Sequence, residues 1–169
     1  MIRHLKTVID NKDILVIYPE ARYSLCGTTA IIPPSVGKLV KLLNVPVVTL
    51  ITHGHHINSP FWNLQQRNNR TEATLTQLFT KQQVKDLSVD DINKKILEEF
   101  QYDDYAWQKE NEIKITYKDR AKGLHKVLYQ CPNCLVEYKM NSNGDLLWCD
   151  HCKKKWQMDE YGQLNALSD

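Results

Sequence analysis

Four of the five cysteines form two Cys-x-x-Cys pairs, Cys131–Cys134 and Cys149–Cys152, with fourteen residues between the pairs. Each pair is short enough for both thiolates to bind one ion from a single tight turn. Four sulfurs make the closed tetrahedral shell of a structural Zn²⁺, with no position left for water or substrate. Four free cysteines are the alternative, and His151 could replace one thiol, but the intact spacing before Cys152 favours four sulfurs.

The residues between the two pairs predict a β-hairpin, with Asn143-Gly144-Asp145 as its turn. The whole module resembles a zinc ribbon. A module of about 35 residues buries little apolar surface, so bound metal would supply much of its folding energy. Lys153-Lys154-Lys155-Trp156 is a basic run with an aromatic residue, as in nucleic-acid contacts. Residues 119–169 carry seven basic and seven acidic residues, so we expect a docking or stabilising ribbon rather than nucleic-acid binding.

A second pair of reactive side chains, Glu20 and Arg22, follows the apolar run Ile14–Tyr18. The run predicts a buried strand that ends at Pro19, because proline cannot donate to a strand ladder. Ligands of α/β proteins gather just beyond strand ends. A guanidinium matches phosphate bidentately, and Glu20 could hydrogen-bond a hydroxyl or hold the arginine. A purely structural Glu–Arg pair is the alternative.

The elements that would position this pair continue along the chain. Ser35 can cap a helix whose apolar face is Val36, Leu39, Val40 and Leu43, and Asn44 ends it. Residues 45–51 then predict a second strand. The pattern of strand, polar loop, helix and parallel strand is one βαβ unit, so the predicted fold class is α/β.

These residues also carry a resemblance to a family. The block Tyr18-Pro19-Glu20-Ala21-Arg22-Tyr23-Ser24 resembles the FPEGTRS block of the PlsC-like (1-acylglycerol-3-phosphate) acyltransferases. Gly37 through Val48 resembles a later block, in which a glycine opens a helix and a Val-Pro-Val strand follows. The Gly and Thr of the first family block are Ala21 and Arg22 here, and its arginine position holds Tyr23.

The resemblance implies transfer of an acyl group from acyl-CoA or acyl-ACP to a lysophospholipid such as lysophosphatidate. The family's His-x-x-x-x-Asp block, which supplies its general base, does not occur before Tyr18. We therefore assign no catalytic residue and expect this shortened chain to be inactive. The alternative is a non-catalytic remnant that binds a lipid phosphate or a protein. The substrate-binding residues implied by the resemblance are Glu20, Arg22, Ser24, Gly37 and Pro46.

The predicted organisation is a partial PlsC-like domain over residues 1–118, a connecting helix over 119–130 and the zinc ribbon over 131–165. Residues 1–10 fit a short amphipathic helix. Ser88 predicts the cap of a further helix, with Asp91 three residues on. A domain that begins one helix before a central strand leaves its sheet short of partners. We therefore expect exposed apolar surface near Ile14.

Composition and charge bear on the possible ligands and on the cellular location of the protein. The net charge is +2, and residues 1–60 carry six basic against three acidic residues, where a phosphate or anionic lipid would bind. No apolar run approaches the roughly 20 residues that span a bilayer, and no signal peptide opens the chain. We expect a cytoplasmic protein, with peripheral attachment to the inner face of the membrane left open.

His53, His55 and His56 lack a nearby Cys, Asp or Glu, so a polar loop is favoured over a metal site.

Overall fold

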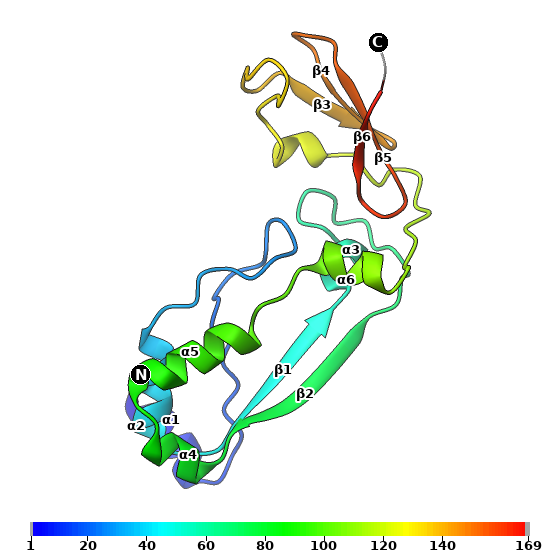
Figure 1. Ribbon diagram of the computed structural model, residues 1–169. Helices are drawn as coiled ribbons and strands as arrows, with labels where there is room; N and C mark the ends of the chain where they lie inside the picture. The colour runs from blue at the N-terminus through cyan, green and yellow to red at the C-terminus, as the bar shows by residue number, and fades with distance from the viewer. Residues whose placement is uncertain (1, 168–169) are drawn as a thin grey trace. The chain divides into compact units, whose positions relative to one another are not determined.

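The computed structural model describes residues 2–167, and contacts within the chain divide it into two compact units (Figure 1). The first unit comprises Met1–Tyr23, Thr29–Ile51 and Ala73–Gln101. The second comprises Ser24–Thr28, Thr52–Glu72 and Tyr102–Asp169. This division differs from the predicted boundaries at residues 118 and 130, because residues 52–72 and 102–118 belong to the same unit as the cysteine module.

The first part of the chain combines helices with a two-stranded sheet. The sheet pairs β1 with β2, which run in opposite directions (Figure 1). The elements are α1 (Ile2–Asp10), α2 (Ser35–Leu43), β1 (Val47–His53), β2 (Glu72–Phe79), α4 (Lys81–Asp86) and α5 (Val89–Glu99). The predicted helices near residues 2, 35 and 89 are confirmed, and the longest of them, α5, has 11 residues. No helix in the described part of the chain is long and apolar enough to cross a membrane.

The core of the first unit follows the predicted apolar faces. Ile92 and Ile96 of α5 are buried, and Val36 and Val40 of α2 pack on the same cluster. The predicted cap of α5 is confirmed, because the Asp91 N–H donates to Ser88 Oγ at 3.1 Å and satisfies one free donor of the first turn. The prediction that Ser35 caps α2 is wrong, because Pro34 is the N-cap residue and no described side chain caps this helix. The apolar faces of both helices are buried as predicted.

The predicted strand at Ile14–Tyr18 does not form, so the prediction of a parallel βαβ unit is wrong. β1 pairs with β2 instead. A run of apolar residues becomes a buried strand only when a neighbouring strand and covering side chains are available. Here Ile14 is 89% exposed and Val16 is 69% exposed. The expectation of exposed apolar surface near Ile14 is confirmed.

The two-stranded sheet is covered on one face only. Thr49 points to the covered face, where it is buried and donates through Oγ1 to Glu99 Oε1 at 2.7 Å. Its neighbours Val48 and Leu50 alternate to the other side, as strand geometry requires, and both are exposed. Leu75 of β2 is exposed as well. The sheet therefore presents an apolar face to solvent.

The second unit ends in a four-stranded antiparallel sheet of order β3-β4-β5-β6. Asn143 pairs with Leu146, so Gly144-Asp145 form the hairpin loop. Gly144 has a φ of +59°, a conformation that favours glycine, and the predicted turn is confirmed. The elements of this unit are α3 (His55–Asn58), α6 (Asp104–Glu110), the 3-10 helix η1 (Leu124–Lys126), β3 (Met140–Asn143), β4 (Leu146–Cys149), β5 (Lys155–Met158) and β6 (Leu164–Ala166).

The predicted connecting helix over residues 119–130 is wrong, because only η1 forms in this segment. Gly123 precedes η1 with a φ of +89°, which a right-handed helix cannot accommodate. A Cβ at this position would lie 2.4 Å from the Trp62 carbonyl oxygen. The close approach of Trp62 therefore requires glycine there and keeps the chain from coiling into one helix.

Gly37 of α2 lies against Asn93 of α5, and this contact yields a prediction. The Gly37 N–H donates to Asn93 Oδ1 at 2.8 Å, and a Cβ at Gly37 would lie 2.4 Å from the same oxygen. We expect Gly37→Ala to lower the free energy of unfolding by about 1–3 kcal/mol through overpacking. Chemical denaturation measures this change. In an Asn93→Ala background the same substitution should cost less, and an equal cost in both backgrounds would contradict the steric explanation.

Candidate metal centre

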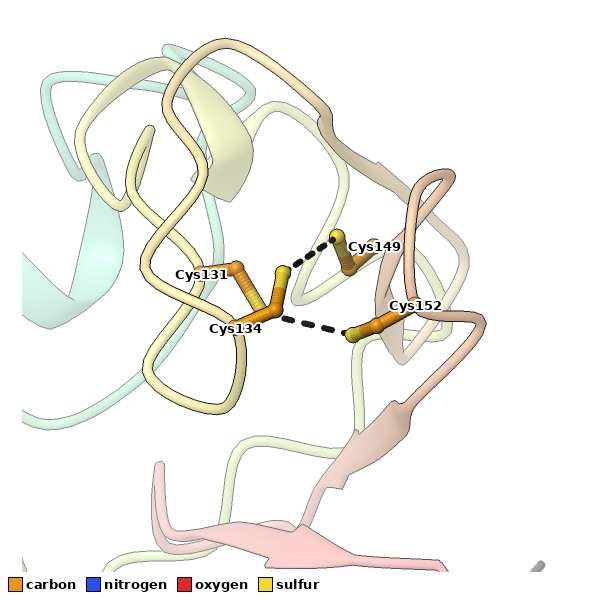
Figure 2. Close-up of side chains that lie close together, drawn as sticks. All are labelled: Cys131, Cys134, Cys149 and Cys152. Atoms are coloured by element: carbon orange, nitrogen blue, oxygen red, sulfur yellow. Dashed lines mark hydrogen bonds between the residues drawn. The ribbon is translucent and has the colours of Figure 1, made fainter.

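Cys131, Cys134, Cys149 and Cys152 bring their side chains together in the second unit (Figure 2). All four Sγ atoms lie within 4.8 Å of one another. The Cys131–Cys152 sulfurs are 3.7 Å apart and the Cys134–Cys149 sulfurs 3.8 Å apart. A tetrahedral Zn²⁺ with Zn–S bonds of about 2.3 Å places its sulfurs about 3.8 Å apart. The observed spacing therefore fits one tetrahedral ion.

The two Cys-x-x-Cys turns have the same backbone form. The Leu135 N–H donates to the Cys131 carbonyl oxygen, and the Lys153 N–H to that of Cys149, both at 2.9 Å. Leu135 and Lys153 each follow the second cysteine of their pair and have φ values of +60° and +65°. Each turn therefore bends tightly enough to direct two thiols toward a common centre.

The neighbours of Cys152 favour its thiolate form. The Asn133 side-chain amide donates to its sulfur at 3.5 Å. This bond, together with the Lys154 backbone N–H, lowers the pKa of Cys152 to about 6. Hydrogen bonds to the sulfur favour the thiolate, which is the form that binds metal. Asn133 was not predicted from the sequence, although its place inside the first cysteine pair is the signal that could have identified it.

Ionisation of Cys134 is opposed by its surroundings. The Val136 backbone N–H lowers the pKa of Cys134, but burial and the hydrogen bonds with the three other thiols outweigh it and raise that pKa to about 12. Four negative charges at this spacing repel one another strongly. A divalent cation relieves that repulsion, so metal binding would release protons from the cluster.

The cluster is also part of a hydrophobic core. Cys131 and Cys149 are fully buried and pack with Trp62, Leu147 and Met158. His151 is exposed and does not belong to the cluster. With four sulfurs on a tetrahedral ion, no position remains for water or substrate. The donor set and its burial thus fit a structural Zn²⁺, as the sequence predicts.

Glu20 and Arg22, predicted to bind substrate, lie in a turn of the first unit. The Ala21 N–H donates to the Tyr18 carbonyl oxygen at 3.1 Å, and Ala21 has a φ of +52°. Glu20 is half-buried and Arg22 is exposed. Neither side chain makes a hydrogen bond or ion pair with any residue that the structure describes. Both charges are therefore available to a ligand.

The other three predicted substrate residues have structural surroundings. Ser24 Oγ donates to the Thr28 carbonyl oxygen at 2.8 Å. Gly37 is buried beneath Asn93, which accounts for the glycine without a substrate. Pro46 is exposed just before β1. Substrate contact by these three residues stays a prediction.

The three histidines at the end of β1 and in α3 do not form a metal site with other residues in the described part of the chain. The His53 ring stacks on Trp107 with centroids 5.5 Å apart, and its Nδ1 lies 3.8 Å from Asp104 Oδ1. His56 packs edge-on against aromatic rings, and burial lowers its pKa, partly offset by the Asp104 carboxylate. Asp104 accepts from the backbone N–H groups of Gly54 and His56, so it anchors this turn.

No family model, curated protein or solved structure matches the chain. Function must therefore be inferred from the side chains themselves and from their geometry. The cysteine cluster specifies its chemistry most narrowly, because ligand type, number and spacing all point to one kind of ion.

We expect the protein to bind one Zn²⁺ per chain, measurable by elemental analysis after dialysis. Cys149→Ser should weaken zinc binding by at least about 10²-fold, because even supporting residues of zinc sites are worth 10- to 100-fold. Cys26 is exposed and lies outside the cluster, so Cys26→Ser is the matched control and should retain full zinc content. Equal zinc content in both variants would contradict the site.

The strained turn after Cys152 yields a further prediction. Lys153→Gly should relieve the cost of a left-handed backbone on a residue with a Cβ. We expect zinc affinity to rise a few-fold, equivalent to about 0.5–1 kcal/mol, in competition with a chelator. His151→Gly in the same turn, which lacks a positive φ, should lower the affinity instead. Equal effects of the two substitutions would rule out strain as the cause.

Proposed function

We propose that this chain is the acceptor-binding part of a PlsC-like acyltransferase that carries a zinc ribbon. The proposed reaction transfers an acyl group from acyl-CoA or acyl-ACP to a lysophospholipid such as lysophosphatidate. The proposed location is the cytoplasmic face of a membrane, where such acceptors are found. The zinc ribbon would stabilise or dock the enzyme rather than take part in chemistry.

The backbone at Ala21 supports this proposal most directly. The residue has a left-handed conformation, with a φ of +52°. The resembling family block has glycine at this position, and glycine is the residue that adopts this conformation without strain. A glycine in the family block would suit such a turn, and this supports the proposed resemblance. The turn presents Glu20 and Arg22 on either side of Ala21.

Arg22 is the residue that we assign to the acceptor phosphate. Its guanidinium is exposed and unpaired in the described structure, and it can donate two parallel hydrogen bonds to phosphate oxygens. Glu20, also unpaired, could accept a hydrogen bond from a glycerol hydroxyl. Together they would orient the acceptor hydroxyl toward the acyl donor.

The chemical step needs a base that this sequence does not supply. In the proposed reaction a histidine removes the hydroxyl proton, and the alkoxide attacks the thioester carbonyl and displaces the thiol. Absence of a general base typically costs about 10²- to 10⁴-fold in rate. The chain alone is therefore expected to bind acceptor with little or no turnover. That behaviour is shared with the alternative, a non-catalytic lipid-phosphate-binding protein.

We expect Arg22→Met to weaken binding of monomeric lysophosphatidate at least about tenfold, a loss of about 1.4 kcal/mol or more, because a charge-assisted hydrogen bond to phosphate is lost. Isothermal titration calorimetry measures the change. Arg3→Met removes another exposed arginine of the same unit and should leave the affinity unchanged. Monoacylglycerol, which lacks the phosphate, should bind equally to the original chain and to Arg22→Met.

Two outcomes would contradict the proposal in different ways. If lysophosphatidate binds equally well to Arg22→Met and to the original chain, the assignment of the acceptor phosphate to Arg22 is wrong. If the chain turns over lysophosphatidate and acyl-CoA rapidly, the expectation of inactivity is wrong, and a base must lie among its own residues.

A further inference from the structure

Arg67 is a buried cation without an acidic partner. Its side chain is among the few charged ones in the core, at 5% exposure. The guanidinium donates from Nη1 to the Ile57 carbonyl oxygen at 3.2 Å and from Nη2 to that of Arg120 at 3.1 Å. It also lies over the Tyr117 ring. No ion pair to Arg67 occurs among the described residues, although arginine is rarely buried unless paired.

The charge on Arg67 is incompletely compensated. Burial lowers the pKa of its guanidinium, partly offset by the hydroxyls of Tyr105 and Tyr117. An arginine nevertheless stays protonated in a protein. The Nε atom is buried and has no hydrogen-bond partner. A buried positive charge with an unsatisfied donor is costly, and a bound anion would reduce that cost.

A polar recess adjoins this arginine. Its volume is about 660 Å³, and none of the residues that line it is acidic. They offer amide, imidazole and hydroxyl groups, which can donate hydrogen bonds to an anion. The polar residues that line the recess include His55, Asn58, Gln66, Arg67, Asn68 and Thr71.

The wall of the recess is held in place by Asn58. The Asn58 carbonyl oxygen accepts from the Arg67 N–H at 2.8 Å. Its side chain exchanges two bonds with the backbone of Asn69, accepting at 2.8 Å and donating at 3.0 Å. Because the loop is already held at Arg67 and Asn69, ligand binding does not have to pay the entropy of ordering it, and this favours affinity.

Two acidic residues near the recess, Glu72 by sequence and Asp104 through its contacts with residues beside His55, are already engaged. Glu72 forms an ion pair with Arg70. Asp104 accepts from the backbone of Gly54 and His56. Neither contributes to the lining of the recess. The recess therefore keeps the positive potential that Arg67 creates.

We propose that this recess binds phosphate or a phosphorylated group. Arg67 supplies the positive potential, and His55 and the amides of Gln66 and Asn68 supply hydrogen bonds. The ligand chemistry is shared by a lysophospholipid headgroup and by the phosphates of coenzyme A. The choice between these two ligands rests on the proposed function, whereas the anion site itself does not.

Titration of the full ¹⁵N-labelled chain with inorganic phosphate tests the site by nuclear magnetic resonance. We expect saturable shift changes for the amides of residues 55–71, with a dissociation constant of about 1 mM. His55 is exposed, so His55→Glu should fold normally and weaken phosphate binding at least tenfold by repulsion. Arg67→Met should abolish it. Lys126→Met, which removes an exposed cation of the same unit outside the lining of the recess, is the control and should bind as before.

Titrations with coenzyme A and with monomeric lysophosphatidate then identify the source of the phosphate, because the natural ligand should bind more tightly than inorganic phosphate. Absence of saturable shifts with phosphate, or shifts that persist in His55→Glu, would overturn the site even if Arg67→Met failed to fold. This experiment measures binding at the recess without turnover. Its failure is therefore distinguishable from failure of the Arg22 experiment.

Discussion

The convergence of four cysteine sulfurs within 4.8 Å of one another is the constraint on which the second unit depends. Cys131 and Cys149 are fully buried, so their sulfurs cannot turn to solvent to escape one another. They pack directly on Trp62, Leu147 and Met158, and closure of that core therefore requires the sulfurs to come together. A bound divalent cation would make that approach favourable, and folding of the unit would then be coupled to metal binding.

The features that the sequence predicted correctly are those governed by local chemistry. The Ser88 cap, the turn at Gly144 and the two cysteine turns each depend on hydrogen bonds or ligands within a few residues. The cysteine cluster spans a longer gap, but four identical soft ligands at regular spacing leave few interpretations other than a metal site. Such signals need no knowledge of the rest of the fold.

The features that were missed depend on contacts distant in sequence. Ile14–Tyr18 has the composition of a buried strand, yet a strand needs a partner, and β1 is paired with β2. The segment 119–130 has helical periodicity, but Gly123 packs against the backbone of Trp62. Arg67 lies in a polar loop, where an arginine is expected to be exposed. Only the folded structure shows that it is buried and packs over the Tyr117 ring. Sequence periodicity alone carries none of this information.

The uncovered face of the two-stranded sheet affects how this protein behaves in concentrated solution. Val48, Leu50 and Leu75 offer an apolar surface on a sheet that has only two strands. Exposed apolar strands promote association, because their unpaired edges and uncovered side chains can both bind strands of another molecule. Colloidal stability should therefore decline as concentration rises, and a charged residue in place of Leu75 would act as a gatekeeper against aggregation.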